Sequence, residues 1–389
     1  MTPVYVAAAL RTPMGRFRGA LAGVRADHLG AHVLRRLVGV AGIDPTEIDD
    51  VIFGCVTQVG EQSANIARTS LLGAGWPVTI PGMTVDRKCG SSEAAIHVAT
   101  AQIASGLSNL VIAGGAESMS RVKMGGNREI YGEAFGWMAA EAHELTSQGE
   151  AAERLVDRWS LGRNQLDDYA AESHRRAALA CAEGWFTDQI AATPVAELCE
   201  RDWEGPRDLL VADETIRRDT SREKLAELKP SFRPDGRLTA GNASQLSDGA
   251  AGVLLVSAAA LKRHDMAPLA RICAVAVVGS DPTLMLTGPI AASREAVAQA
   301  GLAFDDIDLF EINEAFASVP LVWMHETGVA HDRLNVNGGA IALGHPLGAT
   351  GARIATSLIH ELGRRGGRYG VQAICCAGGL ATATVYERL

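Results

Sequence analysis

Residues 41–49 of the chain read AGIDPTEID, and residues 300–308 read AGLAFDDID. An alanine-rich helical pattern precedes each copy, and a short apolar strand pattern follows each. A second pair, LVIAGG at 110–115 and AICCAGG at 373–379, repeats in the same order and at almost the same offset. Two matches at nearly one offset indicate that the chain consists of two homologous halves.

Within each half, short apolar strand patterns alternate with helical patterns. This alternation predicts an α/β fold in which helices cover parallel or mixed sheets. Helices are expected at residues 26–40, 92–105, 293–300 and 349–363. Between the halves charge density rises and strand patterns thin out, and a helical stretch is expected at 165–183.

The expected domain boundaries follow from this change in charge density and strand content. Residues 1–118 form the N-terminal half, which a segment at about 240–268 completes, and residues 269–389 form the C-terminal half. Residues 119–239 form an inserted domain of helices and loops. That domain either covers the active site or decorates one side of the molecule.

The formal net charge of −9 argues against nucleic acid as a partner. Binding the phosphate backbone requires clustered positive charge. Residues 217–237 are a local exception, with seven basic residues against four acidic ones. We expect this stretch either to receive a small anion, such as a nucleotide phosphate, or to be a solvated surface arm.

The seven cysteines are odd in number and show no C-x-x-C pairing. This argues against a disulfide framework or a zinc site and favours a reducing compartment. No apolar run approaches the ~18 residues of a membrane span. We therefore expect a cytoplasmic protein with no metal site and no membrane partner.

Residues 335–353 read NVNGGAIALGHPLGATGAR and surround one histidine, His345, with glycines. Glycine permits positive φ and close approach of the backbone, so such a loop can hold an imidazole against a substrate. A neutral imidazole can take a thiol proton and then stabilise a developing oxyanion. His345 is therefore expected to be a general base.

Two separate cysteine sites accompany this histidine. Cys89 precedes a predicted helix, whose N-terminus would stabilise a thiolate together with the charges of Arg87 and Lys88. Cys375, at the end of a strand, would be a second acid or base, and its neighbour Cys376 is the alternative for that role. The opposing interpretation is that these cysteines are buried and inert.

Asn313 directly follows a strand, where functional residues collect in α/β proteins. Its amide can donate to an oxyanion or position a water there, and it can also cap a helix. Two thiols and an imidazole, without a metal signature, suit acyl transfer through a thioester.

Six motifs together resemble the thiolases, the acetyl-CoA acyltransferases, over essentially the whole chain. They are RTPMG at 11–15, CGSS at 89–92, AGGAESMS at 113–120, GNAS at 241–244, NEAF at 313–316 and GHPLG at 344–348. Each alone is weak, but six in this order are specific. The resemblance implies a five-layered αβαβα thiolase fold of two duplicated α/β halves with an inserted loop domain, assembled as a homodimer or homotetramer.

The resemblance also implies roles for the candidate residues. Cys89 would attack the thioester or ketone carbonyl and carry the acyl group, and His345 would activate Cys89. Cys375 would exchange a proton with the α-carbon of acetyl-CoA or with the CoA thiol. Asn313, through a water, would join His345 in one oxyanion hole. Backbone N–H groups at Cys89 and near residues 377–378 would form the other.

The same resemblance implies where coenzyme A binds. Arg217 matches the position that meets the CoA nucleotide, and Ser244 and Phe316 match positions along the pantetheine arm. No cofactor would be tightly bound, since coenzyme A and acetyl-CoA are substrates. CoA thioesters are therefore the expected partners.

Three residues depart from the pattern of the family. Ala377 stands where the motif Cys-x-Gly-Gly-Gly has a glycine, so the second oxyanion hole is expected to differ slightly. Gln148 stands where many short-chain biosynthetic members have methionine, which would relax the limit on acyl length. Leu286, where glycine is common, would shape the pocket in the opposite sense.

The expected function is reversible acyl transfer between an acyl-CoA and acetyl-CoA, with thiolytic cleavage of a 3-ketoacyl-CoA favoured. One alternative is a biosynthetic acetoacetyl-CoA thiolase. Another is a ketoacyl-synthase-like enzyme, which typically has histidine where this chain has Cys375. The third is a CoA- or lipid-binding protein that has lost catalysis.

Overall fold

The computed structural model describes residues 2–129, 132 and 134–389 of the chain. Its main feature is one sheet with the strand order β10-β11-β12-β9-β1-β8-β5-β3-β4. The N-terminal strands are β1 (Val4–Arg11), β3 (Asp50–Gly54), β4 (Gly82–Val85), β5 (Leu110–Ser118) and β8 (Ser247–Ser257). The C-terminal strands are β9 (Ala270–Gly279), β10 (Leu309–Ile312), β11 (Tyr369–Cys376) and β12 (Leu380–Arg388). A short strand β2 (Gly15–Arg16) also pairs with β8.

The two groups of strands repeat one plan. β3 pairs in parallel with β4 and β5, and β10 pairs in parallel with β11. The last strand of each half, β8 or β12, then pairs antiparallel with the strand before it. The halves join where residues 4–6 of β1 pair antiparallel with residues 270–272 of β9.

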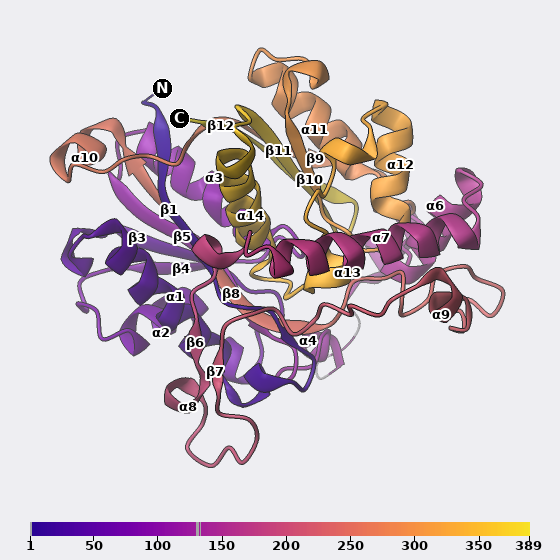
Figure 1. Cartoon of the computed structure of the whole chain (residues 1–389), viewed down its shortest axis with the longest axis horizontal. Coiled ribbons are helices and arrows are strands. Elements are labelled where there is room, and N and C mark those ends of the chain that lie inside the picture. Colours follow the sequence, from indigo (N-terminus) through magenta and orange to yellow (C-terminus); the bar gives the residue numbers. More distant parts are fainter. Residues whose placement is uncertain (1, 130–131, 133) are drawn as a thin grey trace.

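Helices form three layers around these strands (Figure 1). Helices α1 (Ala26–Ala41) and α2 (Ile66–Gly73) share a buried apolar cluster with the N-terminal strands. Helices α11 (Gly288–Gln299) and α12 (Ser318–Thr327) do the same on the C-terminal strands. Helices α3 (Ser91–Ala104) and α14 (Thr350–Arg365) lie between the halves, and their apolar cluster includes residues of both. This is the five-layered αβαβα arrangement that the resemblance implied, and it is confirmed.

The predicted helices are all present, but one begins earlier than predicted. α1, α3 and α14 match the expected ranges to within one or two residues. α11 begins at Gly288, five residues before the predicted start. Gly288 and Pro289 suggest a turn, but proline fits the first turn of a helix because its missing N–H has no partner there.

Most of the segment between the halves is helical or irregular. Its helices are α4 (Gly126–Glu129), α5 (Trp137–Ala142), α6 (Gln148–Arg158), α7 (Arg163–Ala182), α8 (Val195–Leu198) and α9 (Arg222–Ala226), with β6 (Thr193–Pro194) and β7 (Leu209–Leu210) as a small hairpin sheet. α6 packs against α12, and α7 packs against α13 (Ala340–Leu343). α10 (Ala258–Arg263) follows β8. Figure 1 shows α6, α7 and α9 together beside the C-terminal half.

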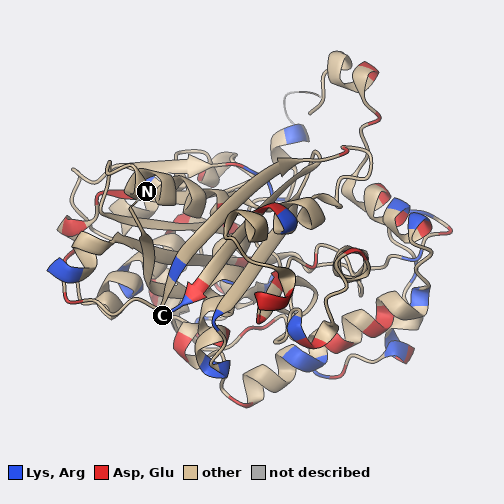
Figure 2. Ribbon diagram, turned by 90° about the horizontal axis from the view of Figure 1, so that it is seen from above, with Lys and Arg blue, Asp and Glu red and all other residues tan. Residues whose placement is uncertain are grey.

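The parallel strands bring the candidate residues to one region. Cys89 follows β4, Asn313 follows β10, and Cys375 lies at the end of β11. The carboxyl ends of parallel strands are where functional residues gather in α/β folds. Charged residues lie mainly on the outer helices and loops, while the central strands carry few (Figure 2).

A close approach of backbone to backbone between the halves generates a stability prediction. A Cβ added at Gly115 in β5 would lie 2.0 Å from the carbonyl oxygen of Gly348, which belongs to the His345 loop. A clash with backbone cannot be relieved by a side-chain rotation, so Gly115→Ala should lower the free energy of unfolding by at least about 1–3 kcal/mol. Urea unfolding measures this change.

Gly39 in α1 is the matched control, because a Cβ there meets nothing within 4 Å. Gly39→Ala should raise the free energy of unfolding by about 0.5–1 kcal/mol, since alanine is the better helix former. Equal stability of the two variants would contradict the close contact.

Candidate active site

Cys89 lies in the turn between β4 and α3 and is only 3% exposed. Burial raises the pKa of its thiol to about 11. The side-chain amide of Gln148, 3.8 Å from the sulfur, and the backbone N–H groups of Cys89 and Ala377 act in the opposite direction. The helix-stabilised thiolate stays a prediction. Burial is the largest influence on this pKa, larger than that of Lys88, and it favours the protonated thiol.

His345 is buried in its glycine loop, and each of its ring nitrogens lies near a polar side chain. The Thr350 hydroxyl donates its single proton to the Pro346 carbonyl at 2.9 Å, while its oxygen lies 2.7 Å from His345 Nδ1. We assign this oxygen as the acceptor of Nδ1–H, which leaves Nε2 without a proton. Burial, followed by the charge of Arg353, lowers the pKa of His345 to about 3. The imidazole is neutral, with Nε2 as a free base.

Asn313 lies next to this free nitrogen. Its Nδ2 is 3.4 Å from His345 Nε2, and its backbone N–H donates to the Ala373 carbonyl at 3.0 Å. The side-chain oxygen is buried and has no hydrogen-bond partner among the described residues. Asn313 does not cap a helix, because α12 begins at Ser318 and its cap, Ala317, makes no side-chain bond. The capping interpretation is therefore wrong.

Cys375 and Cys376 end β11 and are both completely buried. Cys375 belongs to the apolar cluster that contains Phe316. Cys376 lies against Gly90, because a Cβ added there would be 2.7 Å from its sulfur. Burial raises the pKa of both thiols, and negative charge on Cys89 raises each pKa further. Both sulfurs are thus electrostatically close to Cys89, and the preference for Cys375 stays a prediction.

Two buried glutamates, which sequence reasoning missed as separate residues, hold the loops that carry these groups. Glu117 accepts from the backbone N–H groups of Val56, Thr57 and Gly348, each at 2.9 Å. It thereby ties the His345 loop to the N-terminal half. Its signal in the sequence is its place at the end of a buried strand, within the AGGAESMS motif.

Glu314 connects the inserted segment to the C-terminal half. It accepts from Tyr169 and Ser173 of α7 at 2.9 and 2.8 Å, and from the backbone N–H of Ile341 at 3.0 Å. The long helix α7 is thereby tied to the loop that leads to His345. Glu314 is the second residue of the NEAF motif and would be found as the neighbour of Asn313.

The three candidate CoA-binding residues lie along one track. Residues 243 and 316 form a backbone bridge, which places Ser244 beside Phe316. The next residue, Gln245, accepts from the His345 backbone N–H at 3.0 Å. Its side-chain oxygen lies 3.5 Å from a guanidinium nitrogen of Arg217. Gln245 therefore connects Arg217 to the histidine loop.

Most of the charges in the basic stretch 217–237 are neutralised locally. The ion pairs are Arg222 with Asp168, Lys224 with Asp219, Arg233 with Glu150 and Asp157, and Arg237 with Asp157. Arg217, Arg218 and Lys229 have no ion pair with any residue that the structure describes. An anion would therefore meet fewer free cations than the sequence suggests.

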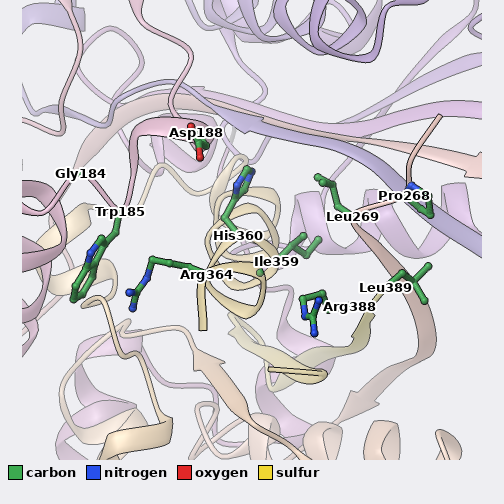
Figure 3. A pocket seen from close by; sticks show the side chains of 11 residues that line it. Gly184, Trp185, Asp188, Pro268, Leu269, Ile359, His360, Arg364, Arg388 and Leu389 are labelled. Carbon is green, nitrogen blue, oxygen red and sulfur yellow. The ribbon is translucent and has the colours of Figure 1, made fainter. Parts of the chain in front are cut away.

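A pocket of about 240 Å³ opens at Cys89. Its lining residues come from both halves and from the inserted segment: Val56, Thr57, Lys88, Cys89, Met124, Gly125, Asn127, Arg128, Gln148, Leu347 and Ala377. A different pocket of about 500 Å³ lies at the C-terminal half of α14, where Arg364 stacks over Trp185 (Figure 3). None of the candidate residues lines that larger pocket.

The comparisons with known proteins agree with this geometry. Residues 4–259 match the family model described as the N-terminal domain of thiolase, and residues 266–388 match that of the C-terminal domain. The chain belongs to the thiolase family. Within the part of the chain that the structure describes, each helix is too short or too polar to cross a lipid bilayer.

Several thiolases resemble this one over its full length. A steroid 3-ketoacyl-CoA thiolase of Mycobacterium tuberculosis is 44% identical, with 100% of this chain and 95% of the relative covered. A beta-ketoadipyl-CoA thiolase of Pseudomonas putida is 41% identical, with 100% of each covered. The crystal structure of an acetyl-CoA acetyltransferase of Bacillus anthracis matches with a TM-score of 0.90, at 40% identity and with 100% and 99% coverage.

The hydrogen bond between Thr350 and His345 generates a prediction for this thiolase. Thr350→Val removes the acceptor of Nδ1–H, so the imidazole can carry its proton on Nε2 instead, and kcat should fall about tenfold. Thr350→Ser keeps the acceptor and should retain most of the activity. Steady-state thiolysis of acetoacetyl-CoA is the measurement.

Thr356 is a control on the same helix, because its hydroxyl donates to the Ala352 carbonyl at 2.8 Å and does not contact His345. Thr356→Val should leave kcat within twofold of the wild type. If Thr350→Val is equally active, the tautomer assigned to His345 is incorrect.

Proposed function

We propose that this thiolase cleaves 3-ketoacyl-CoA with coenzyme A, and catalyses the reverse condensation, through an acyl group carried on Cys89. The observation that carries the proposal is the neutral His345, whose Nε2 is assigned without a proton and lies 3.4 Å from Asn313 Nδ2. The loop that holds His345 also reaches the Cys89 pocket, where Leu347 lines the wall. A base with this tautomer can accept the thiol proton without first losing one of its own.

In thiolysis, His345 Nε2 takes the proton of Cys89, and the sulfur attacks the ketone carbonyl of the substrate. The bond between the α-carbon and this carbonyl carbon then breaks. Cys375 gives its proton to the α-carbon, and acetyl-CoA leaves. The incoming CoA thiol gives its proton to the Cys375 thiolate and attacks acyl-Cys89. The released Cys89 recovers its proton from His345.

Charge that develops on oxygen is stabilised in two places. The new Nε2–H of His345, with a water held by Asn313, donates to the oxyanion formed on the thioester that becomes acetyl-CoA. The backbone N–H groups of Cys89 and Ala377, which lie close enough to lower the pKa of the Cys89 thiol, form the second donor pair. Fixed donors of this kind require no reorganisation when the charge appears.

Burial of the thiols and the imidazole supports this order of events. Burial raises the pKa of Cys89 and lowers that of His345, so the resting pair is neutral rather than an ion pair. The proton then moves from Cys89 to His345 as the sulfur attacks the ketone carbonyl. The negative charge develops on the carbonyl oxygen, which is better stabilised than the buried thiolate.

Coenzyme A would enter along the track of Arg217, Ser244 and Phe316. Arg217 is exposed at its outer end, while Phe316 packs edge-on against Phe232 with ring centroids 5.3 Å apart. The inserted segment 119–239 would cover this side of the site as a domain between the two halves. We also propose that the protein is a homodimer or homotetramer and that it is located in the cytoplasm.

Similarity to the relatives does not define the acyl group, because the names of these relatives give different substrates. We favour degradative thiolysis because Gln148 lines the Cys89 pocket, where short-chain biosynthetic enzymes commonly have methionine. The likeness to the acetyl-CoA acetyltransferase supports acetoacetyl-CoA synthesis as the second candidate. Turnover with 3-ketoacyl-CoA substrates of different length separates the two.

The covalent step is tested by intact-protein mass after brief mixing with acetyl-CoA. The wild type should gain one acetyl group, which free coenzyme A removes, and Cys89→Ala should gain none. An acetylated Cys89→Ala protein would exclude Cys89 as the nucleophile. Coenzyme A binding without any adduct in the wild type would instead support a non-catalytic binding protein.

The choice between the two adjacent cysteines is tested by separate substitutions. Cys375→Ser should still be acetylated on Cys89 but lose at least about 100-fold in condensation and α-proton exchange, the usual contribution of an acid–base group. Cys376→Ser should retain both. The reverse result would assign the proton transfer to Cys376. Deuterium exchange into acetyl-CoA, followed by mass spectrometry, measures this step.

A further inference from the structure

One carboxyl group lies buried between the two halves, and the mechanism above does not use it. Glu93 belongs to the first turn of α3, four residues after Cys89, and is completely buried. Its neighbours along the helix, Ala95, Ile96 and Ala99, belong to the apolar cluster between the halves. A buried carboxyl group is costly unless it forms hydrogen bonds. Glu93 therefore has to be held by polar partners within this apolar layer.

Those partners come from β12, in the other half of the chain. The hydroxyl of Thr382 donates to Glu93 Oε2 at 2.5 Å, and the hydroxyl oxygen of Thr384 lies 2.7 Å from Oε1. The two threonines are two residues apart in the strand, so their side chains lie on the same face. Glu93 thus connects the helix that follows Cys89 to the hairpin of β11 and β12.

This hairpin carries the candidate acid–base thiols. Cys375 and Cys376 end β11, and Thr382 pairs with the residue before Cys375. A Cβ added at Gly90 would lie 2.7 Å from the sulfur of Cys376 and 2.8 Å from the hydroxyl oxygen of Thr382. The hydrogen bond from Thr382 is therefore formed directly beside the two thiols.

Glu93 also lies against the helix that supports the histidine. A Cβ added at Gly351 in α14 would be 2.3 Å from the backbone nitrogen of Glu93 and 2.8 Å from its Cβ. Gly351 follows Thr350, whose hydroxyl oxygen contacts His345. The elements that carry Cys89, the two thiols and the support of the histidine therefore meet at Glu93.

A neutral histidine completes the hydrogen bonds of Glu93. Thr384 Oγ1 lies 2.9 Å from Nε2 of His97, and burial lowers the pKa of this imidazole to about 3. Burial raises the pKa of Glu93 to about 7, so it gains or loses a proton near neutral pH. Other ionisable groups around it are Arg87, Cys376 and Tyr386.

The contact with β12 persists in both protonation states of Glu93. The ionised carboxylate accepts from Thr384, which accepts from Nε2–H of His97. The protonated acid donates to Thr384, which then donates to an unprotonated Nε2. Thr382 donates to the other carboxyl oxygen in either state. A glutamine at position 93 would have the same pattern of donor and acceptor as the protonated acid.

We propose that Glu93 is a positioning residue for the acid–base step: it holds the hairpin of β11 and β12 against α3, with the thiol at the end of β11 within reach of a substrate at Cys89. The inference rests on the proposed thiolase function and adds a residue that acts through another group. Glu93 does not line the pocket at Cys89. A misplacement of about 1 Å can slow a reaction about 100-fold, so small movements of the hairpin matter.

Glu93→Met and Glu93→Gln form the test, because both side chains are close in size to glutamate but only glutamine forms hydrogen bonds. In Glu93→Met, kcat for deuterium exchange into acetyl-CoA should fall at least about tenfold, the effect of losing a hydrogen bond to a charged group. KM for acetyl-CoA should stay within about twofold, because the coenzyme A track is elsewhere. Glu93→Gln should restore most of the exchange.

Thr382 provides the same test from the other side of the contact, and keeps it decisive if Glu93→Met does not fold. Thr382→Val should lose exchange as Glu93→Met does, and Thr382→Ser, which keeps the hydroxyl, should restore it. Ser293→Ala is the control. The buried Ser293 accepts from Trp323 Nε1 at 3.2 Å and donates to the Pro289 carbonyl at 2.7 Å, in the outer layer of the C-terminal half. It should lower stability in urea but leave kcat for exchange within about twofold.

Two results would overturn the proposal. One is exchange at the wild-type rate in Glu93→Met and Thr382→Val. The other is an equal loss in Glu93→Met and Glu93→Gln, because glutamine can form every hydrogen bond of the protonated acid.

Acetylation of Cys89 by acetyl-CoA separates this inference from the function on which it rests. If the wild type is acetylated and exchanges deuterium, and Glu93→Met does both equally well, only the role of Glu93 is wrong. If the wild type neither forms the adduct nor exchanges deuterium, the thiolase function fails, and the inference fails with it.

Discussion

The arrangement of the site depends on a contact of backbone with backbone between the two halves. The Gly348 carbonyl lies so close to Gly54 and Gly115 that a Cβ at either position would clash with it. The Gly348 N–H is held at the same place by the carboxylate of Glu117. This contact carries a histidine loop of the C-terminal half to the cysteine of the N-terminal half. Glycine is required there because only a backbone without side chains approaches so closely.

Burial then sets the protonation of the groups that the contact brings together. Removing water disfavours any charged form, so the pKa of Cys89 rises and that of His345 falls. The same dry environment makes unpaired polar groups costly. Glu117 and Glu314 are accordingly surrounded by donors, from backbone and from side chains. Removal of water therefore explains both the donors that surround the Glu117 and Glu314 carboxylates and the neutral state of Cys89 and His345.

Local pattern was sufficient for most of the fold. The repeated motif at 41–49 and 300–308 indicated two halves, and helical periodicity located α1, α3 and α14 almost to the residue. It failed at the start of α11, where Gly288 and Pro289 look like a turn but occupy a first helical turn. It also missed Glu117 and Glu314 as anchors, because a position at the end of a buried strand marks such a residue but does not identify its partners, which are far away in the chain.

The sequence alone determined the family and the duplicated α/β fold and predicted which residues react, because motifs and periodicity are local properties. Tertiary structure decided the state of those residues. It placed the Thr350 hydroxyl at Nδ1 and the Asn313 amide near Nε2 of His345, and it buried Cys89, which raises the pKa of its thiol. It also neutralised most of the basic stretch 217–237 through partners such as Asp157 and Asp168. Protonation and charge pairing depend on burial and on distant partners, which exist only once the chain has folded.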